Sequence, residues 1–543
     1  MCSKVSMPVA RTSPGIDIEA VPSGVRTIAG VATSITAFVG SAPRGPVAEP
    51  TTISSYADYE RIFGGLSLDS TVSYAVRAFY LNGGSQAVIV RLARSPGIEA
   101  DASEAATITL PALSSPAGPL VLVAASVGAW GNHLSALVEH DTSDPANDSL
   151  FNLTVSETGG TTETFLDVSS DPASPRYLPR VLDQGSMFVR VNKDSADQFE
   201  IADIRPSETF TTASPPTSPP TVEPAPVAAV GGRDGGPLTQ AQFTGTGMAA
   251  SNSGLFALEK VDLFNLLCIP PFSSDADVTA DLLAQAVTYC KKRRAILLVD
   301  PPARWTSTAI AKKELADGTY PGISGPISNH AALFFPRLKQ PNPLRGNQLE
   351  ESVPCGALAG VFARTDTQRG VWHAPAGQDA VLVGVPQLSV PLTDDDNGEL
   401  NPLGINCLRA FPAIGCVVWG ARTLEGADRL ASEWKYIPVR RTALFIEESL
   451  FRGTQWMIFE PNDEPLWSTI RLNVGTFMQD MFRQGAFKGN TPSEAYFVKC
   501  DKETTTHNDV NLGIVNVIVG FAPLKPAEFV ILKIQQIAGQ IEV

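Results

Sequence analysis

The sequence predicts a multidomain protein built from α/β and β parts, and three observations carry this prediction. The chain has 543 residues, more than a single hydrophobic core usually holds. Residues 54–92 follow the order helix, helix, Gly-Gly and apolar strand, which is typical of a sheet covered by helices on both faces. Residues 100–205 instead alternate apolar and polar side chains between turn residues, which predicts an antiparallel β insertion.

The first predicted element is a strand near the N-terminus. In PGIDIEAVPSG (14–24), Ile16 and Ile18 alternate with Asp17 and Glu19, which is the period of a half-buried strand. A strand so close to a chain end needs a partner to order it. The partner belongs either to this chain, through a hairpin at the Pro-Ser-Gly turn, or to another copy of the chain.

An α/β layout follows the first strand. Residues 31–46 predict a second strand closed by a Pro/Gly turn, and residues 54–65 predict a short helix that serine caps and glycine ends. A second helix runs to the Gly-Gly pair at 83–84, and AVIVRL (87–92) predicts a buried strand.

The β insertion and the segment after it are rich in turn residues. The stretches LVLVAAS, LSALVEH, LFNLTVSET and MFVRVNK are separated by Asp, Gly, Pro and Asn, as expected for antiparallel strands. Residues 212–226 contain six prolines, which predicts an exposed linker or loop that cannot hold a strand ladder.

The α/β pattern resumes over residues 235–425. A helix is predicted before AILLVD (295–300), which reads as a buried and parallel strand. The basic residues Lys291 to Arg294 lie at the end of this helix, where the helix dipole favours positive charge. One face of the helix is apolar, and its residues are Val278, Leu282, Ala286, Val287 and Cys290.

The last part of the chain contains the most regular amphipathic helix, which is predicted to end near Gly485. Two strands are predicted after it, at 513–524 and 528–537, so the chain begins and ends with strands. The apolar residues of the helix follow the 3, 4, 7 spacing and are Trp467, Ile470, Val474, Phe477, Met478, Met481 and Phe482.

Charge and hydropathy exclude two classes of protein. Lys+Arg 41 against Asp+Glu 56 give a net charge of -15, which argues against a general nucleic-acid binder. From Ala431 onward, 11 basic and 13 acidic residues leave the chain nearly neutral. The sequence has no run of 18 apolar residues and no signal-peptide pattern, so we expect neither membrane insertion nor an export signal.

The seven cysteines are scattered, odd in number and never spaced as C-x-x-C, so neither a zinc site nor a disulfide framework is expected. Most should be small buried hydrophobic residues. Cys2 differs because it lies in the N-terminal tail, where its thiol either stays free or forms a crosslink to another subunit.

A search for catalytic chemistry yields one alternative function. Asp300 closes an apolar strand and His330 lies downstream, so an α/β hydrolase with a Ser-His-Asp triad is conceivable. The G-x-S-x-G nucleophile elbow is absent, and an Asp before Pro-Pro is more often a turn former. We therefore predict no catalytic residues.

Cofactor and metal motifs are weak or absent. GTGMAA (245–250) follows no clear strand, so it is a poor dinucleotide fingerprint, and no phosphate-binding loop occurs. His133 and His140 lack a third metal ligand. The arginines of 362–377 and 419–424 lie beside acids and aromatics; this combination could clamp a substrate, but we favour an interface or domain corner.

Several stretches that follow one another along the chain form a recognisable set. They are PGIDIEAVPSGVRTIAGVATSITAFVGSAPRGP, YERIFGG, VRAFYLNGGSQAVIVRL, AWGNHL, GGRDG, ARTDTQRGVWHAPAG, GINCLRAFPAIGCVVWGARTL, WKYIPVRRTALFIEESL and SEAYFVKCD. Together they resemble the tail sheath proteins of contractile injection systems. This family covers contractile-tailed bacteriophages, R-type pyocins and extracellular injection particles. The resemblance is weakest in the β insertion and the proline-rich stretch.

The resemblance implies a fold with a subtilisin-like α/β domain that lacks a protease triad. It also implies an outer antiparallel β insertion domain and a C-terminal α/β sheath domain with terminal strand-exchange arms. The corresponding residue ranges are 1–27 for an N-terminal linking arm, 28–99 for an N-terminal α/β part, 100–206 for the outer insertion, 207–234 for a proline-rich linker, 235–428 for the subtilisin-like domain, 429–524 for the inner sheath domain and 525–543 for a C-terminal linking arm.

The resemblance further implies a structural subunit and not an enzyme, with no cofactor and no metal. Its partners would be other copies of itself in stacked hexameric rings, an inner tail tube, and baseplate and tail terminator proteins, without direct contact to nucleic acid. The protein would be made in a bacterial cytoplasm and reside in a virion tail, a pyocin or a toxin-delivery particle.

Two sets of site residues follow from the resemblance. The first set would form strands between neighbouring subunits and comprises Ile16, Asp17, Ile18, Glu19, Val530, Leu532 and Ile534. The second set would face the tube and comprises Arg483, Lys488 and Glu494.

Overall fold

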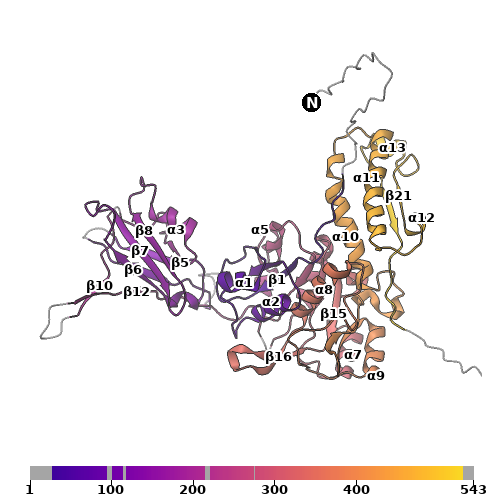
Figure 1. The fold of residues 1–543 in the computed structure, drawn as a ribbon, viewed down its shortest axis with the longest axis horizontal. Helices are drawn as coiled ribbons and strands as arrows, with labels where there is room; N and C mark the ends of the chain where they lie inside the picture. Colours follow the sequence, from indigo (N-terminus) through magenta and orange to yellow (C-terminus); the bar gives the residue numbers. More distant parts are fainter. Residues whose placement is uncertain are drawn as a thin grey trace, which may run out of the picture. The chain divides into compact units, whose positions relative to one another are not determined.

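The computed structural model describes residues 27–94, 101–113, 118–202, 204–213, 221–273 and 276–529 (Figure 1). Contacts divide the chain into two units. One unit contains residues 31–448 and the segment from Pro523, and the other contains residues 449–522 and the segment up to Gly30. The division falls within helix α10 (Ile437–Gly453).

The larger unit is built on an eight-stranded sheet with the order β2-β3-β1-β13-β14-β15-β19-β20. The six inner strands are parallel, and the two edge strands are antiparallel to their neighbours. The strands are β1 (Thr36–Gly40), β2 (Thr51–Ile53), β3 (Ala87–Arg91), β13 (Leu266–Cys268), β14 (Ile296–Val299), β15 (Ala331–Phe335), β19 (Ile405–Phe411) and β20 (Gly415–Val418).

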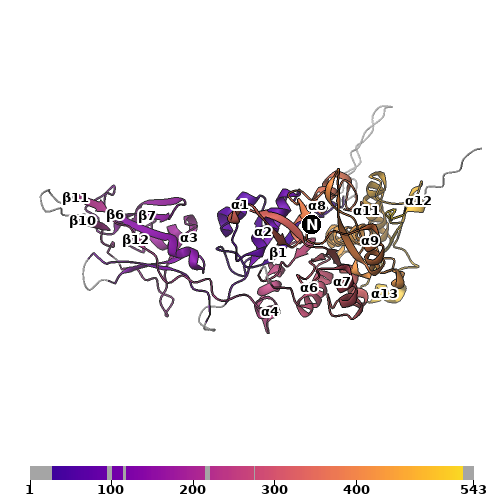
Figure 2. The same ribbon diagram turned by 90° about the horizontal axis from the view of Figure 1, so that it is seen from below.

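Helices cover both faces of this sheet, as Figure 2 shows for α8 and α6 on opposite sides of β1. Phe38 of β1 faces one apolar core and its neighbour Val39 faces the other, because successive strand residues point to opposite faces. The first core is covered by α1 (Tyr56–Phe63), α2 (Thr71–Leu81) and α8 (Cys355–Arg369). The second is covered by α4 (Gln240–Thr244), α6 (Ala280–Lys292), α7 (Thr308–Ala316) and α9 (Asp394–Leu400).

The predicted helix caps are confirmed. The Ser55 side chain accepts a hydrogen bond from the backbone of α1, and Gly64 ends this helix in the left-handed conformation with φ 91°. Ser70 caps α2 in the same way as Ser55 caps α1. The predicted parallel strand after α6 is β14, which pairs with β13 and β15.

The β insertion consists of two antiparallel sheets around one apolar core, as the alternating pattern predicts. Helix α3 (Leu178–Gly185) packs on the same core. One sheet has the order β12-β6-β7-β8, with β12 (Val227–Ala228), β6 (Leu134–Glu139), β7 (Leu150–Glu157) and β8 (Thr162–Ser169). The other has the order β4-β5-β9, with β4 (Thr107–Leu110), β5 (Leu120–Ala124) and β9 (Val189–Val191).

The expectation that residues 212–226 hold no strand ladder is wrong. Strands β10 (Phe210–Ala213) and β11 (Thr221–Pro224) form an antiparallel pair, and β12 then joins the insertion sheet. Four of the six prolines lie in the sequence between the two strands and are not among the residues whose pairing is described. The residues that pair therefore keep their backbone donors, apart from Pro224 at the end of the ladder.

A buried arginine fixes the junction between the large sheet and the insertion. Arg91, the last residue of β3, is 3% exposed. Its guanidinium donates hydrogen bonds to the main-chain oxygens of Ala42 at 2.8 Å, Gly45 at 2.7 Å, Pro43 at 3.2 Å and Val127 at 2.8 Å. All four acceptors are backbone atoms. Burial lowers the pKa of Arg91 to about 10, so its side chain stays cationic at neutral pH.

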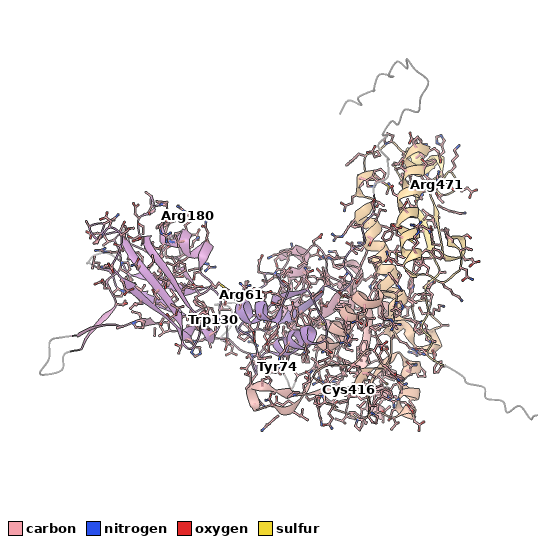
Figure 3. The ribbon with its side chains drawn as sticks, in the orientation of Figure 1. Arg61, Tyr74, Trp130, Arg180, Cys416 and Arg471 are labelled. Atoms are coloured by element: carbon pink, nitrogen blue, oxygen red, sulfur yellow. The ribbon has the colours of Figure 1, made fainter. Side chains whose placement is uncertain are left out.

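A second arginine supports the same junction. Arg44 forms an ion pair with Glu157 of β7 at 3.0 Å. Its guanidinium also lies 5.7 Å from the ring centre of Trp130, which Figure 3 labels. The turn that follows β1 therefore contacts the insertion at two places, Trp130 and Glu157.

The smaller unit contains α11 (Glu464–Arg483) packed on a two-stranded antiparallel sheet of β21 (Tyr496–Lys499) and β22 (Ile518–Phe521). The predicted apolar face of α11 is confirmed, because every predicted residue except Phe482 is buried. The strand predicted at 513–524 begins only at Ile518, since the backbone N–H of Asn516 bonds to the Thr505 hydroxyl at 3.0 Å instead. Helices α12 (Pro492–Ala495) and α13 (His507–Asn511) complete this unit.

Shorter elements complete the described part of the chain. The hairpin of β16 (Leu338–Asn342) and β17 (Gln348–Ser352) pairs with β18 (Gln387–Leu388), and α5 (Met248–Ser251) follows α4. The 3-10 helices are η1 (Ala129–His133), η2 (Gly254–Lys260), η3 (Gly325–His330), η4 (Pro343–Arg345), η5 (Asn401–Leu403), η6 (Leu424–Gly426), η7 (Asp428–Leu430) and η8 (Gln455–Met457).

Candidate assembly site

The predicted arm strands and Cys2 lie outside the described residues. Ile16, Asp17, Ile18 and Glu19 precede residue 27, and Val530, Leu532 and Ile534 follow residue 529. The structure does describe the two segments from which these arms extend, 27–35 and 523–529. Each of these segments is held by a buried arginine that the sequence analysis did not assign to it.

The N-terminal segment is held by an ion pair between α8 and α10. Arg441 donates to both carboxylate oxygens of Asp366, at 2.8 and 2.6 Å, and the side chains are only 4% and 3% exposed. Thr33 completes the arrangement, because its hydroxyl donates to Asp366 at 2.7 Å and its carbonyl accepts from Arg441 at 2.9 Å. The ring of Phe362 lies 5.1 Å from the Arg441 guanidinium. Thr33 is thereby fixed three residues before β1.

The C-terminal segment is held by Arg422, which belongs to the WGARTL stretch. The side chain of Arg422 is fully buried, and its Nε donates to Oε1 of Glu528 at 2.7 Å while Nη2 donates to Oε2. Its Nη1 donates to the Asn401 carbonyl at 2.8 Å and to Asp428 at 3.0 Å. These contacts make Arg422 a buried anchor within the larger unit, so we assign it to an internal domain corner.

The two-stranded sheet of the smaller unit leaves strand edges open. Within the described residues, β21 pairs only with β22. An isolated two-stranded sheet is marginal in water, and an open edge offers unpaired N–H and C=O groups to another strand. Phe497 and Ile518 on these strands are 51% and 48% exposed. The sheet therefore has both the backbone groups and the apolar side chains to accept a further strand.

The predicted tube-facing residues all belong to the smaller unit and are exposed. Arg483 ends α11, and its side chain is 72% exposed with Asp480 at 3.8 Å. The backbone N–H of Lys488 donates to the Ala522 carbonyl at 2.9 Å, next to the end of β22. Glu494 accepts a hydrogen bond from the backbone of Asn490 at 2.9 Å. Lys488 thus lies shortly before α12, and Glu494 lies within it.

Asp300 and His330 do not form a catalytic pair. Asp300 Oδ1 accepts a hydrogen bond from the backbone N–H of Cys355 at 2.8 Å, at the start of α8. His330 Nδ1 donates to the Ala295 carbonyl at 3.0 Å, and Nε2 then accepts from Arg440 at 2.9 Å. Both ring nitrogens are occupied, and burial lowers the pKa of His330 to about 4, so this side chain cannot act as a base toward a serine.

Burial raises the pKa of Asp300 to about 6, because the ionised carboxylate would lose its hydration. Because the pKa of Asp300 is higher in the folded chain than in the unfolded chain, protonation of this carboxyl stabilises the folded chain. This stabilisation is fully present below about pH 4 and is lost as the pH rises through about 6. We expect Asp300→Asn to remove this component, which amounts to at most about 3 kcal/mol. Urea unfolding of both proteins between pH 4 and pH 8 measures it.

The exposed Asp317, at the end of α7, provides a matched control. Asp317→Asn should follow the wild-type pH dependence. If the difference in stability between wild type and Asp300→Asn stays constant over this pH range, the buried carboxyl does not titrate as described.

A cleft of about 580 Å³ lies between α2 and the β16–β17 hairpin. Tyr74, Arg337 and Glu350 are among the residues that line it, whereas neither Asp300 nor His330 does. The cleft therefore does not bring the predicted acid and base together.

The other sequence motifs have structural roles. GTGMAA begins directly after the short helix α4, and its last three residues belong to α5, so it does not follow a strand. His140 contacts the carbonyl of Pro206 at 2.8 Å, and no group of three or more potential metal ligands occurs among the described residues. Arg364 of α8 donates to main-chain carbonyls of the same unit. No helix within the described ranges is long and apolar enough to cross a membrane.

The cysteines from Cys268 to Cys500 are buried and free, as the sequence suggested for most of them. Burial raises the pKa of the Cys407 thiol to about 12, which makes it unreactive at neutral pH. A crosslink through Cys2 stays a prediction.

Asp366, Arg441 and Glu528 were not predicted from the sequence as site residues. Asp366 lies in the quoted ARTD stretch and Arg441 in the quoted VRR stretch, so their position in charged motifs was visible. Nothing in the sequence indicated that they pair, because 75 residues separate them. Glu528 is the only acidic residue between 510 and 541, and this isolation was the only signal in the sequence.

Comparison with protein families gives two matches in chain order. The family described as "Phage tail sheath protein central domain" matches residues 243–424, and "Phage tail sheath C-terminal domain" matches residues 431–537. Together the two matches cover just over half of the chain.

Curated relatives are tail sheath proteins. The tail sheath protein of Burkholderia phage BcepMu is 28% identical over 267 residues, which are 46% of this chain and 53% of that protein. A putative prophage major tail sheath protein of Pseudomonas aeruginosa is 25% identical over 186 residues, 34% of this chain and 45% of that protein. The matched region thus spans about half the length of these relatives.

Solved sheath structures share the fold over almost the whole chain. The sheath of an extracellular contractile injection system, PVC, in the contracted state has a TM-score of 0.57 at 19% identity and covers 97% of this chain and 99% of its own. A sheath tail protein of Listeria innocua has a TM-score of 0.57 at 14% identity, covering 92% and 96% of the two chains. The mixed α/β multidomain fold with several sheets is therefore that of tail sheath proteins.

The family is one of structural tail proteins, so the prediction of a structural protein and not an enzyme is confirmed. The resemblance recognised in the sequence is confirmed as well. The chain belongs to the contractile tail sheath protein family, which includes phage, prophage and extracellular contractile injection system sheaths.

Proposed function

We propose that this chain is the subunit of a contractile sheath that polymerises as stacked hexameric rings around an inner tail tube. The observation that carries this proposal is the match to both sheath domain families, in order, over residues 243–424 and 431–537. Contraction from an extended state would drive the tube through the envelope of a target cell.

The mechanism needs no nucleotide. The extended sheath is metastable, and contraction buries more surface between subunits than extension does, so the energy is stored at assembly. A baseplate signal releases the first ring, and linked arms move each next ring in turn. A tail terminator protein would close the other end. Contacts that do not close on themselves build a helical cylinder from identical chains.

The parts of the chain have different roles in this proposal. The body around the eight-stranded sheet is the subtilisin-like α/β domain, drawn from both 28–99 and 235–428, and it lacks a protease triad. The insertion at 100–206 and the following segment at 207–234 are outermost, because their polar turns suit a solvated surface. The smaller unit, within 429–524, is innermost.

The arms at 1–27 and 525–543 connect subunits by strand addition. Ile16 and Ile18 of one copy, and Val530, Leu532 and Ile534 of another, extend a neighbour's β21–β22 sheet. The open strand edges and the exposed Phe497 and Ile518 support this acceptor.

The tube-facing surface contains Arg483, Lys488 and Glu494. Charges at the rim of an interface guide registry more than affinity, and the contact must release during contraction. We expect the double variant Arg483→Glu, Lys488→Glu to reduce assembly on purified tubes roughly tenfold, since each reversal replaces attraction by repulsion. Sheath polymers without a tube should form normally, and electron microscopy with co-sedimentation measures both.

Lys502→Glu is the matched control, because Lys502 is an exposed cation of the same unit. This variant should assemble on tubes like the wild type. Normal assembly of the double variant on tubes would place the tube contact elsewhere.

The particle is a phage tail or an extracellular contractile injection particle. The relatives include both kinds, since one is a Burkholderia phage protein and others are sheaths of extracellular injection systems. Genes for capsid and terminase next to this one would identify a phage, and toxin genes would identify an injection particle.

Electron microscopy of the purified chain tests the proposed function. A sheath subunit should form hollow tubes with sixfold symmetry in the absence of any other protein, in the contracted arrangement. A chain that stays monomeric at high concentration, alone and with tube protein, would contradict the proposal.

A further inference from the structure

The described part of the C-terminus stops one residue after a buried contact. Phe529 is 77% exposed, whereas the preceding Glu528 is held by the guanidinium of Arg422 through two hydrogen bonds. Residues 530–543 extend beyond this point. Within the described part of the chain, Glu528 is therefore the residue next to this segment that is bound to the body of the subunit.

Arg422 is itself fixed to the large sheet. Its backbone N–H donates to Asn406 Oδ1 at 2.6 Å, and Asn406 Nδ2 donates back to the Arg422 carbonyl at 2.7 Å. Asn406 lies in β19 and also donates to the Leu333 carbonyl of β15 at 3.0 Å. A continuous chain of hydrogen bonds thus connects the Glu528 carboxylate to two neighbouring parallel strands.

The side chain of Arg422 has no contact with bulk water, and two further groups support the pair. Tyr436 donates its hydroxyl hydrogen to Glu528 at 3.3 Å, and Lys435 lies 4.0 Å from the same carboxylate. A planar guanidinium that binds a carboxylate through two parallel bonds fixes orientation as well as distance. The contact therefore sets the direction in which residue 529 leaves the subunit.

We propose that the Arg422–Glu528 pair is the anchor of the C-terminal arm, which transmits tension on residues 530–543 into the eight-stranded sheet. This inference rests on the proposed sheath function and adds the residues that position the arm. Without the anchor, residues 523–529 would detach from the body of the subunit. Movement of one subunit would then first extend this segment, and only afterwards move the subunit of the next ring.

Glu528 is the better residue to change, because its loss need not unfold the body. Arg422 keeps the carboxylate of Asp428 and the Asn401 carbonyl when Glu528 is removed. Once residues 523–529 detach, water can reach the guanidinium as well. We therefore expect Glu528→Ala, and the isosteric Glu528→Gln to a smaller degree, to release the arm and leave the sheet folded.

The first measurement is the reaction of Arg422 with phenylglyoxal in the monomer, followed by mass spectrometry. Arg422 should be protected in the wild type and react about tenfold faster or more in Glu528→Ala, since a hydrogen bond to a charged group is worth at least that factor. Glu399→Gln removes the exposed ion pair between Glu399 and Lys312, and it should leave Arg422 protected. Continued protection in Glu528→Ala would overturn the anchor.

The second measurement is polymerisation of the full chain, compared with a chain that ends at residue 529. Glu528→Ala should assemble as poorly as this truncated chain, and combining the two changes should add nothing, because both act through the arm. Circular dichroism should show unchanged secondary structure in each. Wild-type assembly by Glu528→Ala, next to a truncated chain that fails, would overturn the anchor but leave the sheath function intact. Failure of the wild type itself would instead contradict the proposed function.

Discussion

A chain that lacks residues 1–22 should fold but no longer polymerise. About 20 extended residues span roughly 65 Å, which exceeds the width of a domain, so the arm can reach a neighbour. Each buried Ile contributes about 1.5–3 kcal/mol and each strand hydrogen bond about 1 kcal/mol. If Ile16 and Ile18 pair with a neighbouring subunit as proposed, losing them removes several kcal/mol from every junction of the cylinder.

Sedimentation and circular dichroism measure this outcome. Because Thr33 and its contacts with Asp366 and Arg441 remain in the truncated chain, the melting temperature should stay close to that of the wild type. A chain that aggregates or melts at lower temperature would show that the strand pairs within its own subunit. A truncated chain that still forms tubes would show that the N-terminal arm is not needed.

Of the substitutions proposed for this chain, those that break the Asp366–Arg441 pair should lower the free energy of unfolding the most. Both side chains are almost fully buried, so Asp366→Ala leaves a guanidinium without its carboxylate in a dry site. Removing one partner of such a pair costs about 3–5 kcal/mol. Urea unfolding should show this loss in the larger unit, since α8 and Arg441 both belong to it.

Two further variants separate charge from packing. The double variant Asp366→Leu, Arg441→Met should recover most of the loss, because an apolar pair of similar volume often replaces a buried ion pair without cost. Glu399→Ala breaks an exposed pair and should cost less than about 1 kcal/mol. Equal losses for Asp366→Ala and Glu399→Ala would mean that burial of the ion pair has no effect.

The elements that were predicted correctly are those that depend on residues close together in the sequence. Ser55 and Gly64 identified the ends of α1 because a cap needs only the residues of one turn. The apolar faces of α6 and α11 were visible for the same reason, since a helical face repeats every few residues.

Long-range arrangements could not be predicted in this way. Strand β1 pairs with β13, more than 200 residues further along the chain, so two stretches treated as separate parts build one sheet. The pairs Arg441–Asp366 and Arg422–Glu528 depend on that arrangement, and no local pattern encodes them. The strand pair β10–β11 was missed because composition was averaged over the segment, although the prolines gather between its two strands.

The junction at Arg91 has a consequence for how the sequence of the β insertion can diverge. Its four acceptors are main-chain oxygens, which every residue type has, so Ala42 and Val127 can change without loss of a hydrogen bond. Gly45 is an exception, because its φ of 105° and a clash of any Cβ with Phe63 at 2.7 Å require glycine. Arg91 is also irreplaceable, since lysine has a single nitrogen for four carbonyls. An insertion of different sequence can therefore be joined to the same body as long as these two residues and the path of the backbone are kept.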